Sequence, residues 1–402
     1  MRLFSLVLTF TLFAFAQQVT AQQENSDLAA SARLIAQKSL IVDTHIDVPY
    51  RLHEGWVDVT VATPDGDFDY ERAKRGGLDV LFMSIYTPAE MEATGGSFQL
   101  ANELIDSSEA LVGRAPDKFM MVHNTADAEK ARQKGLIGLA LGMENGSPIE
   151  GKLENVQFFY NRGIRYITLA HALSNHISDS SYDTNRPWKG LSPFGREVVA
   201  EMNRVGIMVD ISHVSDEAFY QVLEITKVPV IASHSSARFF TPGFERNMDD
   251  DMIKALGANG GVIQINFASS FLTKPARDWS DTMDKAQKAW LAETGTAEDS
   301  EAAREWEKAY RVQQPFPYAS ISDLADHFDH VVELVGMDHV GIGSDFDGVG
   351  DSLPVGIKDV SFYPALIEEL LRREYTPQQI EAILGGNLMR VWRAVEQAVA
   401  RP

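Results

Sequence analysis

Eight apolar runs of strand length recur along this 402-residue chain, and most are separated by stretches with helical patterning. The runs cover residues 40–47, 79–86, 137–144, 164–171, 207–213, 228–234, 260–267 and 340–345. Near-continuous apolar runs are typical of strands buried on both faces, and repeated strand–helix units indicate a parallel sheet. Eight such units favour a closed (β/α)8 barrel of the TIM type over an open doubly wound sheet.

Two segments interrupt this alternation. The long polar link between His171 and Pro193 is expected to be a loop at the barrel mouth. Residues 268–320, after the seventh strand, form an acidic insert with helical patterning over residues 283–293 and 298–312. This insert has too few apolar residues for a core of its own, so we interpret it as a helical excursion able to cover the site. Three more helices are expected after residue 362.

The two ends of the chain and its lack of cysteine suggest an exported protein. Residues 1–21 resemble a secretory signal peptide, because Arg2 precedes an apolar run and Val19-Thr20-Ala21 offers small residues for cleavage. No cysteine and no hydrophobic C-terminal tail is present, so neither a lipid-bearing Cys nor a tail anchor is expected. We expect one mature domain over residues 22–402, periplasmic or secreted, without a stable membrane anchor after signal removal.

A formal net charge of −21 argues against nucleic-acid or anionic-membrane partners, because phosphates would be repelled. The charge says little about the fold.

Ligand-type side chains stand at the C-terminal ends of six of the eight runs. They are His45, Asp47, Glu144, His171, His213, His234 and Asp345. In a parallel barrel these ends meet at one face, where barrel enzymes keep their chemistry. Taken alone, each side chain has an ordinary explanation as a core, loop or turn residue, but seven at equivalent positions favour one shared site. Without cysteine, a metal there must be held by imidazole and carboxylate groups, which suit Zn²⁺ or a similar divalent ion.

The remaining histidines, which lie in helical or loop settings, are expected to be structural; they are His53, His123, His176, His327, His330 and His339. Asp43 is left as either a partner of a ligand or a structural residue.

The order of these motifs resembles the membrane (renal) dipeptidase family of zinc metallopeptidases. The resemblance spans residues 41–396 and rests on His45-Ile46-Asp47, Met143-Glu144-Asn145, residues 166–171, 210–215 and 233–237, Arg246-Asn247 and residues 343–348. One departure from the family pattern is Asn145-Gly146 after the bridging position, where the resemblance favours Glu-Gly.

The resemblance implies two zinc ions per chain. His45 and Asp47 would bind one ion, His213 and His234 the other, and Glu144 would bridge them. Five ligands are too many for one tetrahedral zinc but suit two ions that share a carboxylate. A hydroxide between the ions would attack the peptide bond of a dipeptide substrate.

The resemblance also assigns roles around the substrate. His171 would stabilise the oxyanion. Asp345 would bind the free amino end and handle the proton for the leaving nitrogen. Arg246 would pair with the C-terminal carboxylate, for which Arg238 is a weaker candidate. The subunit number stays open, with a homodimer as one outcome.

Two other functions compete with this interpretation. The nearest is another metal-dependent amidohydrolase, acting on a cyclic amide, lactone or N-acyl amino acid, since fold alone does not determine substrate. Many such barrels carry His-x-His on the first strand, whereas this chain has His45-Ile46-Asp47. The second is an exported binding protein without turnover, which would be expected to lack a group such as His171 or Asp345.

Overall fold

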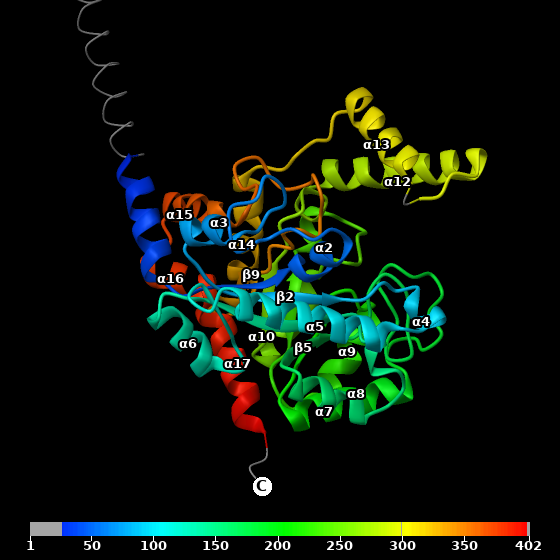
Figure 1. Ribbon diagram of the computed structural model, residues 1–402, viewed down its shortest axis with the longest axis horizontal. Helices are drawn as coiled ribbons and strands as arrows, with labels where there is room; N and C mark the ends of the chain where they lie inside the picture. The colour runs from blue at the N-terminus through cyan, green and yellow to red at the C-terminus, as the bar shows by residue number, and fades with distance from the viewer. Residues whose placement is uncertain (1–25, 299, 400–402) are drawn as a thin grey trace, which may run out of the picture.

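Eight parallel strands form the nearly closed barrel that the sequence predicts (Figure 1). The computed structural model describes residues 26–298 and 300–399, so the predicted signal peptide over residues 1–21 lies outside the described residues. The barrel strands are β1 (Ile41–Ile46), β2 (Leu78–Tyr86), β4 (Ile137–Glu144), β5 (Ile164–Thr168), β6 (Met208–Asp210), β7 (Ile231–Ser235), β8 (Val262–Ile265) and β9 (Val340–Ile342). Each corresponds to one of the eight apolar runs.

Neighbouring strands pair in the order β1-β2-β4-β5-β6-β7-β8-β9. Just beyond the end of β9, Phe346 forms a parallel bridge with Ile46, and the backbone N–H of Asp345 donates to the His45 carbonyl at 3.0 Å. This closure makes His45 and Asp345 neighbours although they lie at opposite ends of the barrel sequence.

Helices surround the barrel and connect its strands (Figure 1). A first helix covers residues 26–38. The others are α2 (Val48–Glu54), α3 (Tyr70–Gly76), α4 (Met91–Thr94), α5 (Ser97–Arg114), α6 (Thr125–Gln133), α7 (Glu154–Asn161), α8 (Pro193–Val205), α9 (Asp216–Ile225), α10 (Asp250–Asn259), α11 (Ser269–Leu272), α12 (Lys274–Thr294), α13 (Glu301–Gln313), α14 (Ile321–Val335), α15 (Tyr363–Arg372), α16 (Pro377–Glu381) and α17 (Asn387–Ala398). Among the described residues, no helix has the length and apolar character needed to cross a bilayer.

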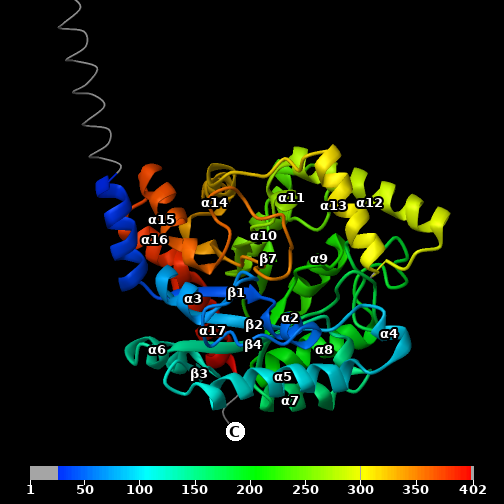
Figure 2. The ribbon, with the colours of Figure 1, turned by 45° about the horizontal axis from the view of Figure 1, so that its top comes forward.

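The insert after the seventh barrel strand is helical, as predicted, but α12 begins earlier than the expected residue 283. Its start is fixed by Thr273, whose side chain accepts a hydrogen bond from the Ala276 N–H, and by a proline in the first turn. Within α12 and α13 as described, only Ala276 and Ala303 are buried. The two helices therefore have no core of their own and project from the barrel rim (Figures 1 and 2).

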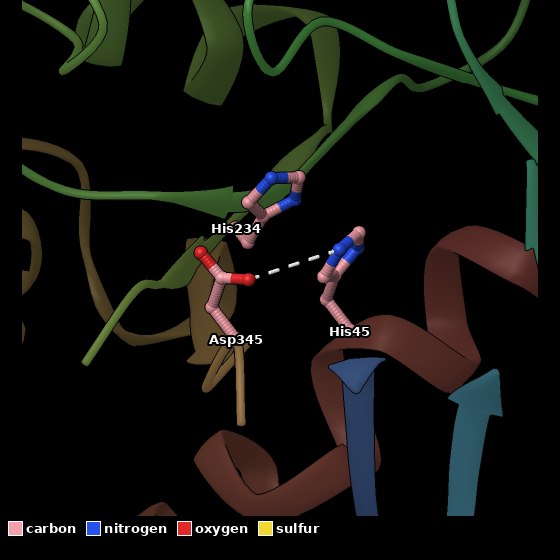
Figure 3. A group of neighbouring side chains, drawn as sticks. All are labelled: His45, His234 and Asp345. Carbon is pink, nitrogen blue, oxygen red and sulfur yellow. Dashed lines mark ion pairs between the residues drawn. The ribbon is translucent and has the colours of Figure 1, made fainter. Parts of the chain in front are cut away.

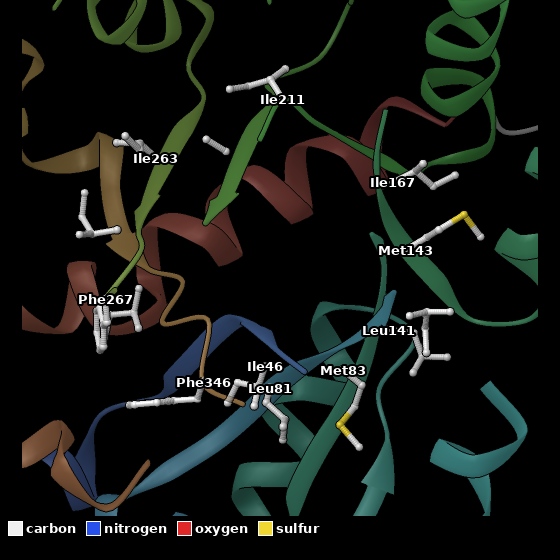
Figure 4. Packing of buried hydrophobic residues seen from close by; sticks show 14 of the residues in the cluster. Ile46, Leu81, Met83, Leu141, Met143, Ile167, Ile211, Ile263, Phe267 and Phe346 are labelled. Atoms are coloured by element: carbon white, nitrogen blue, oxygen red, sulfur yellow. The ribbon is translucent and has the colours of Figure 1, made fainter. Parts of the chain in front are cut away.

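Apolar side chains fill two regions of the barrel. A continuous cluster, part of which Figure 4 shows, lies between strands and helices and includes Leu81, Leu141 and Ile167. A smaller cluster includes Phe82, Tyr166 and Trp392 of α17, with the Phe82 and Trp392 rings 5.2 Å apart. Because α17 packs against the inner side chains near the strand starts, it closes one end of the barrel and leaves the other end for the site.

Candidate functional site

A cavity of about 800 Å³ opens at the C-terminal ends of the barrel strands. Its lining includes Asp47, Glu144, His171, His213, His234, Arg246 and Asp345. His45 is fully buried beside it, with its ring stacked on that of His234 at 3.7 Å. The fold therefore brings all eight predicted site residues together.

One group of ligand-type atoms joins the exit of β1 to that of β4. His45 Nε2 lies 3.4 Å from Asp47 Oδ2 and 3.4 Å from Glu144 Oε2. Asp345 Oδ1 lies 3.9 Å from the same nitrogen, and Figure 3 shows the side chains of His45, His234 and Asp345 turned toward one another.

A second group surrounds the other oxygen of Glu144. Oε1 lies 3.1 Å from His213 Nε2, 3.3 Å from His234 Nε2 and 3.5 Å from His171 Nε2. The Nε2 atoms of His213 and His234 are 2.9 Å apart. Glu144 thus offers a different oxygen to each group.

These spacings suit metal coordination. Ligand atoms on one tetrahedral zinc, each about 2.0–2.1 Å from the ion, lie about 3.3 Å from one another. The site also gathers three carboxylates, those of Asp47, Glu144 and Asp345, which are at most 9% exposed. Buried carboxylates close to one another need positive charge nearby. The site therefore contains groups of nitrogen and oxygen ligands that could hold divalent metal ions.

The protonation states agree with this arrangement. Burial, helped by the Arg246 charge for His213 and by the His45 charge for His234, holds the pKa of both rings well below 6.5. Both rings are therefore neutral at neutral pH, the state that binds a metal. Burial disfavours the charged form of His45, yet Tyr166 and Glu144 raise its pKa well above 6.5, so positive charge is favoured at this point.

The two acids that face the cavity titrate differently. Burial opposes ionisation of Glu144, but the imidazoles of His45 and His171 hold its pKa well below the usual range. Burial, together with the charges of Asp47 and Glu144, raises the pKa of Asp345 to about 8 against the opposing effect of His45. Glu144 is thus a permanent anion and Asp345 a group able to hold a proton near neutral pH.

Tyr166 orients His45 from inside the barrel. Its hydroxyl lies 2.9 Å from His45 Nδ1 and donates to the Thr44 carbonyl at 3.0 Å. Since the hydroxyl proton is used on Thr44, the Nδ1–H of His45 is the donor to Tyr166, so Nε2 is the nitrogen that faces the cavity and would bind a cation after losing its proton. Gly142 provides the room, because a Cβ there would lie 2.0 Å from the Tyr166 ring.

Asp210 has a similar role for His234. Its carboxylate accepts hydrogen bonds from the Ser233 hydroxyl at 2.6 Å and from the Ser212 N–H at 3.0 Å, and also from Thr168. The Ser233 hydroxyl lies 2.7 Å from His234 Nδ1, so this nitrogen donates to Ser233 and Nε2 is again free to bind. Sequence reasoning assigned no such role to Tyr166 or Asp210, although polar residues inside apolar runs are a usable signal.

Two site residues have strained backbone. His213 and Asp345 follow their strands with left-handed φ angles of 68° and 65°. Such conformations cost a non-glycine residue about 1–3 kcal/mol each and cluster at functional sites. The surrounding fold therefore holds these two residues in a backbone conformation that they would not adopt by themselves.

Of the two arginines considered, Arg246 reaches the cavity. Its Nη1 donates to Ser235 Oγ at 2.6 Å and its Nη2 to the His234 carbonyl at 2.7 Å, which fixes the guanidinium over the Phe271 ring. Arg238 instead forms a bidentate ion pair with Asp216 and does not line the cavity. The lining also contains Lys288, which sequence analysis did not single out.

Comparisons with known proteins agree with this geometry. The family model described as membrane dipeptidase, peptidase family M19, matches residues 29–401. A Schizosaccharomyces pombe protein named as an uncharacterized dipeptidase is 34% identical over 397 residues, which cover 93% of this chain and 85% of that protein. Two Pseudomonas aeruginosa structures are each 25% identical to this chain. The probable dipeptidase PvdM has a TM-score of 0.79, with 93% of this chain and 100% of that chain covered. An amidohydrolase has a TM-score of 0.70, with 90% and 98% covered.

Proposed function

Because the chain belongs to the membrane dipeptidase family, we propose that it is a zinc-dependent dipeptidase with two metal ions. The proposal is carried by Glu144, whose Oε2 faces His45 while its Oε1 faces His213 and His234. His45 and Asp47 would hold one zinc, His213 and His234 the other, and Glu144 both. When bound, the ions would supply a hydroxide nucleophile near neutral pH and polarise the peptide carbonyl.

His171 would stabilise negative charge on the carbonyl oxygen. Burial lowers its pKa, so the ring is neutral and keeps one N–H donor. Its Nε2 lies 3.5 Å from Glu144 Oε1, within reach of an oxyanion that forms beside the metal ligands.

Asp345 would bind the amino end of the substrate and transfer a proton to the leaving nitrogen. The side-chain amide of Asn266 donates to its Oδ2 at 2.7 Å, which fixes the carboxyl group toward the cavity. With a pKa near 8, the group can hold and release a proton at neutral pH.

Arg246 would bind the C-terminal carboxylate of the substrate. Its guanidinium is 3% exposed and already oriented by two hydrogen bonds, so its remaining N–H groups can meet a carboxylate with little loss of side-chain entropy. Recognition of both ends of a short substrate would favour dipeptides over longer peptides.

We further propose that the protein is exported through the signal at residues 1–21 and acts on small peptides outside the cytoplasm. We also predict that residues 22–402 form a single mature domain, and that the protein can form a homodimer.

A second candidate function is hydrolysis of a cyclic amide, lactone or N-acyl amino acid. It is favoured by the likeness to the Pseudomonas aeruginosa amidohydrolase, which is 25% identical to this chain.

One assay separates these functions. Purified protein is tested on Ala-Ala, on its amidated and N-acetylated forms, and on a panel of cyclic amides, before and after chelation and zinc restoration. We expect zinc-dependent cleavage of Ala-Ala, weakened when either end is blocked. Cleavage of cyclic or N-acyl amides alone would support the second candidate, and metal binding without any cleavage would support a binding protein.

A further inference from the structure

Lys288 brings a positive charge from the helical insert to the rim of the catalytic cavity. It is the residue of α12 that lines the cavity. A cation at this point is notable because the whole chain carries a net charge of −21, which by itself disfavours acidic substrates.

Aromatic contacts place α12 on the Arg246 side of the cavity. The Arg277 guanidinium of α12 lies 4.5 Å from the centre of the Phe244 ring, and Phe244 contacts Phe271 at 5.2 Å. Phe271 in turn lies 5.2 Å below the Arg246 guanidinium. Residues 277 and 288 are eleven positions apart, about three helical turns, so both face the same way. Lys288 therefore faces the same cavity as Arg246 from further out, about 16 Å along α12 from the turn that packs near Arg246, while residues of α2 line another part of the cavity.

The other cations of the cavity already have partners or a role. Arg51 forms an ion pair with Asp347 at 2.6 Å. Arg246 is oriented for the main-chain carboxylate in the proposed function. Lys288 forms no ion pair within 4.0 Å among the residues that the structure describes. Burial raises the pKa of Asp284, one turn earlier, and the positive charge of Lys288 opposes this larger effect.

From these contacts we propose that Lys288 is a specificity-determining residue that selects dipeptides with an acidic side chain on the C-terminal residue. The inference rests on the proposed dipeptidase function. Arg246 would hold the C-terminal carboxylate, and Lys288 would pair with the side-chain carboxylate of the same residue. A cavity of about 800 Å³ has room for the long side chain of glutamate.

The test measures kcat/KM for Ala-Glu, Ala-Ala, Ala-Lys and Glu-Ala with the wild-type protein and two variants, Lys288→Ala and Lys288→Glu. Alanine and glutamate are good helix formers, so α12 keeps its structure, which circular dichroism checks. We expect the ratio of Ala-Glu to Ala-Ala to fall about fivefold in Lys288→Ala, the size expected for a partly exposed ion pair. In Lys288→Glu the ratio should fall further, while the ratio of Ala-Lys to Ala-Ala rises.

Lys308→Glu provides the matched control. Lys308 lies on α13, is paired with Glu305 at 2.7 Å and is absent from the cavity lining, so the same charge change there should leave all ratios at wild-type values. Substrate ratios that do not respond to Lys288, or that change equally for Glu-Ala and Ala-Glu, would overturn the inference alone. A wild-type protein that cleaves none of the dipeptides would overturn the proposed function and this inference with it.

Discussion

Glu144 has two oxygens that face different groups of ligands, which makes it the residue whose loss should affect both proposed zinc ions. In Glu144→Gln one oxygen becomes an NH₂ group, which is a donor and cannot bind a cation. We expect both ions to be lost together on dialysis, as measured by elemental analysis of the metal content per chain.

The control is Glu154→Gln, because Glu154 is exposed in the first turn of α7 and belongs to no ligand group. A Glu144→Gln protein that retains two tightly held ions would contradict the bridging role.

Gly348 is required by the closeness of two carboxylates. A Cβ at this position would lie 2.2 Å from Asp47 Oδ2 and 2.5 Å from Asp345 Oδ1. Since such contacts do not occur, Gly348→Ala must displace one of these groups. We expect kcat/KM to fall about 10- to 100-fold, the usual effect of disturbing the support of a metal ligand.

Steady-state kinetics with a thermal melt would separate this local effect from unfolding. Gly55→Ala is the matched change, because a Cβ there meets nothing within 4 Å. Wild-type activity in Gly348→Ala would show that the two carboxylates need no fixed position.

At the residue scale, the sequence predicted those site residues whose position follows from the order and direction of the strands. His45 and Asp345 follow apolar runs, and parallel strands bring such positions to one face. Tyr166 and Asn266 were not assigned roles, because their function depends on a hydrogen bond to a particular atom of another site residue. Tyr166 reaches His45 Nδ1, and Asn266 reaches Asp345 Oδ2. The closed fold brings these atoms within hydrogen-bonding distance, and the spacing of the residues along the chain does not predict this.

At the scale of elements, Asp210 connects the exits of β5, β6 and β7 through Thr168, Ser212 and Ser233. In Asp210→Asn the amide nitrogen can no longer accept the Ser233 proton. Ser233 would then donate to His234 Nδ1, which moves the ring proton to Nε2 and removes the metal-binding lone pair. We expect one zinc per chain in place of two, and a loss of about 1–3 kcal/mol in the free energy of unfolding.

Elemental analysis and urea denaturation measure these two effects. Asp117→Asn is the comparison, because Asp117 is exposed outside the barrel. Full zinc content in Asp210→Asn would indicate that the ring keeps its tautomer without the carboxylate.

Predicted elements were accurate where periodicity is strong. The eight barrel strands and the helical insert are present. Sequence missed β3 (Phe119–Met121), which pairs with β4 outside the barrel path, because three residues carry no measurable period. It also placed the start of α12 too late, since the cap at Thr273 precedes any amphipathic pattern.

For the whole molecule, the proposed ions would add links across the open end of the barrel to the hydrogen bonds that already join its strands. Their ligands come from β1, β4 and β7, from Asp47 directly after β1 and from His213 three residues after the end of β6, so they cross the open end of the barrel. The opposite end is closed by α17. Metal removal should therefore loosen the mouth while the α17 end stays packed.

This predicts a lower melting temperature after chelation. An ion present at about 1,000 times its dissociation constant stabilises the folded state by about 4 kcal/mol. With an unfolding entropy near 2.1 cal/mol/K per residue, a chain of this size should lose about 5 °C for one ion and about 10 °C for both, and calorimetry with and without chelator can resolve this change. Zinc should restore the melting temperature, whereas magnesium should not, because it prefers oxygen ligands and three of the five proposed ligands are imidazoles. An unchanged melting temperature in a protein shown to be metal-free would mean that protein contacts alone hold the barrel mouth. The ligand groups would then be held in position without a bound ion.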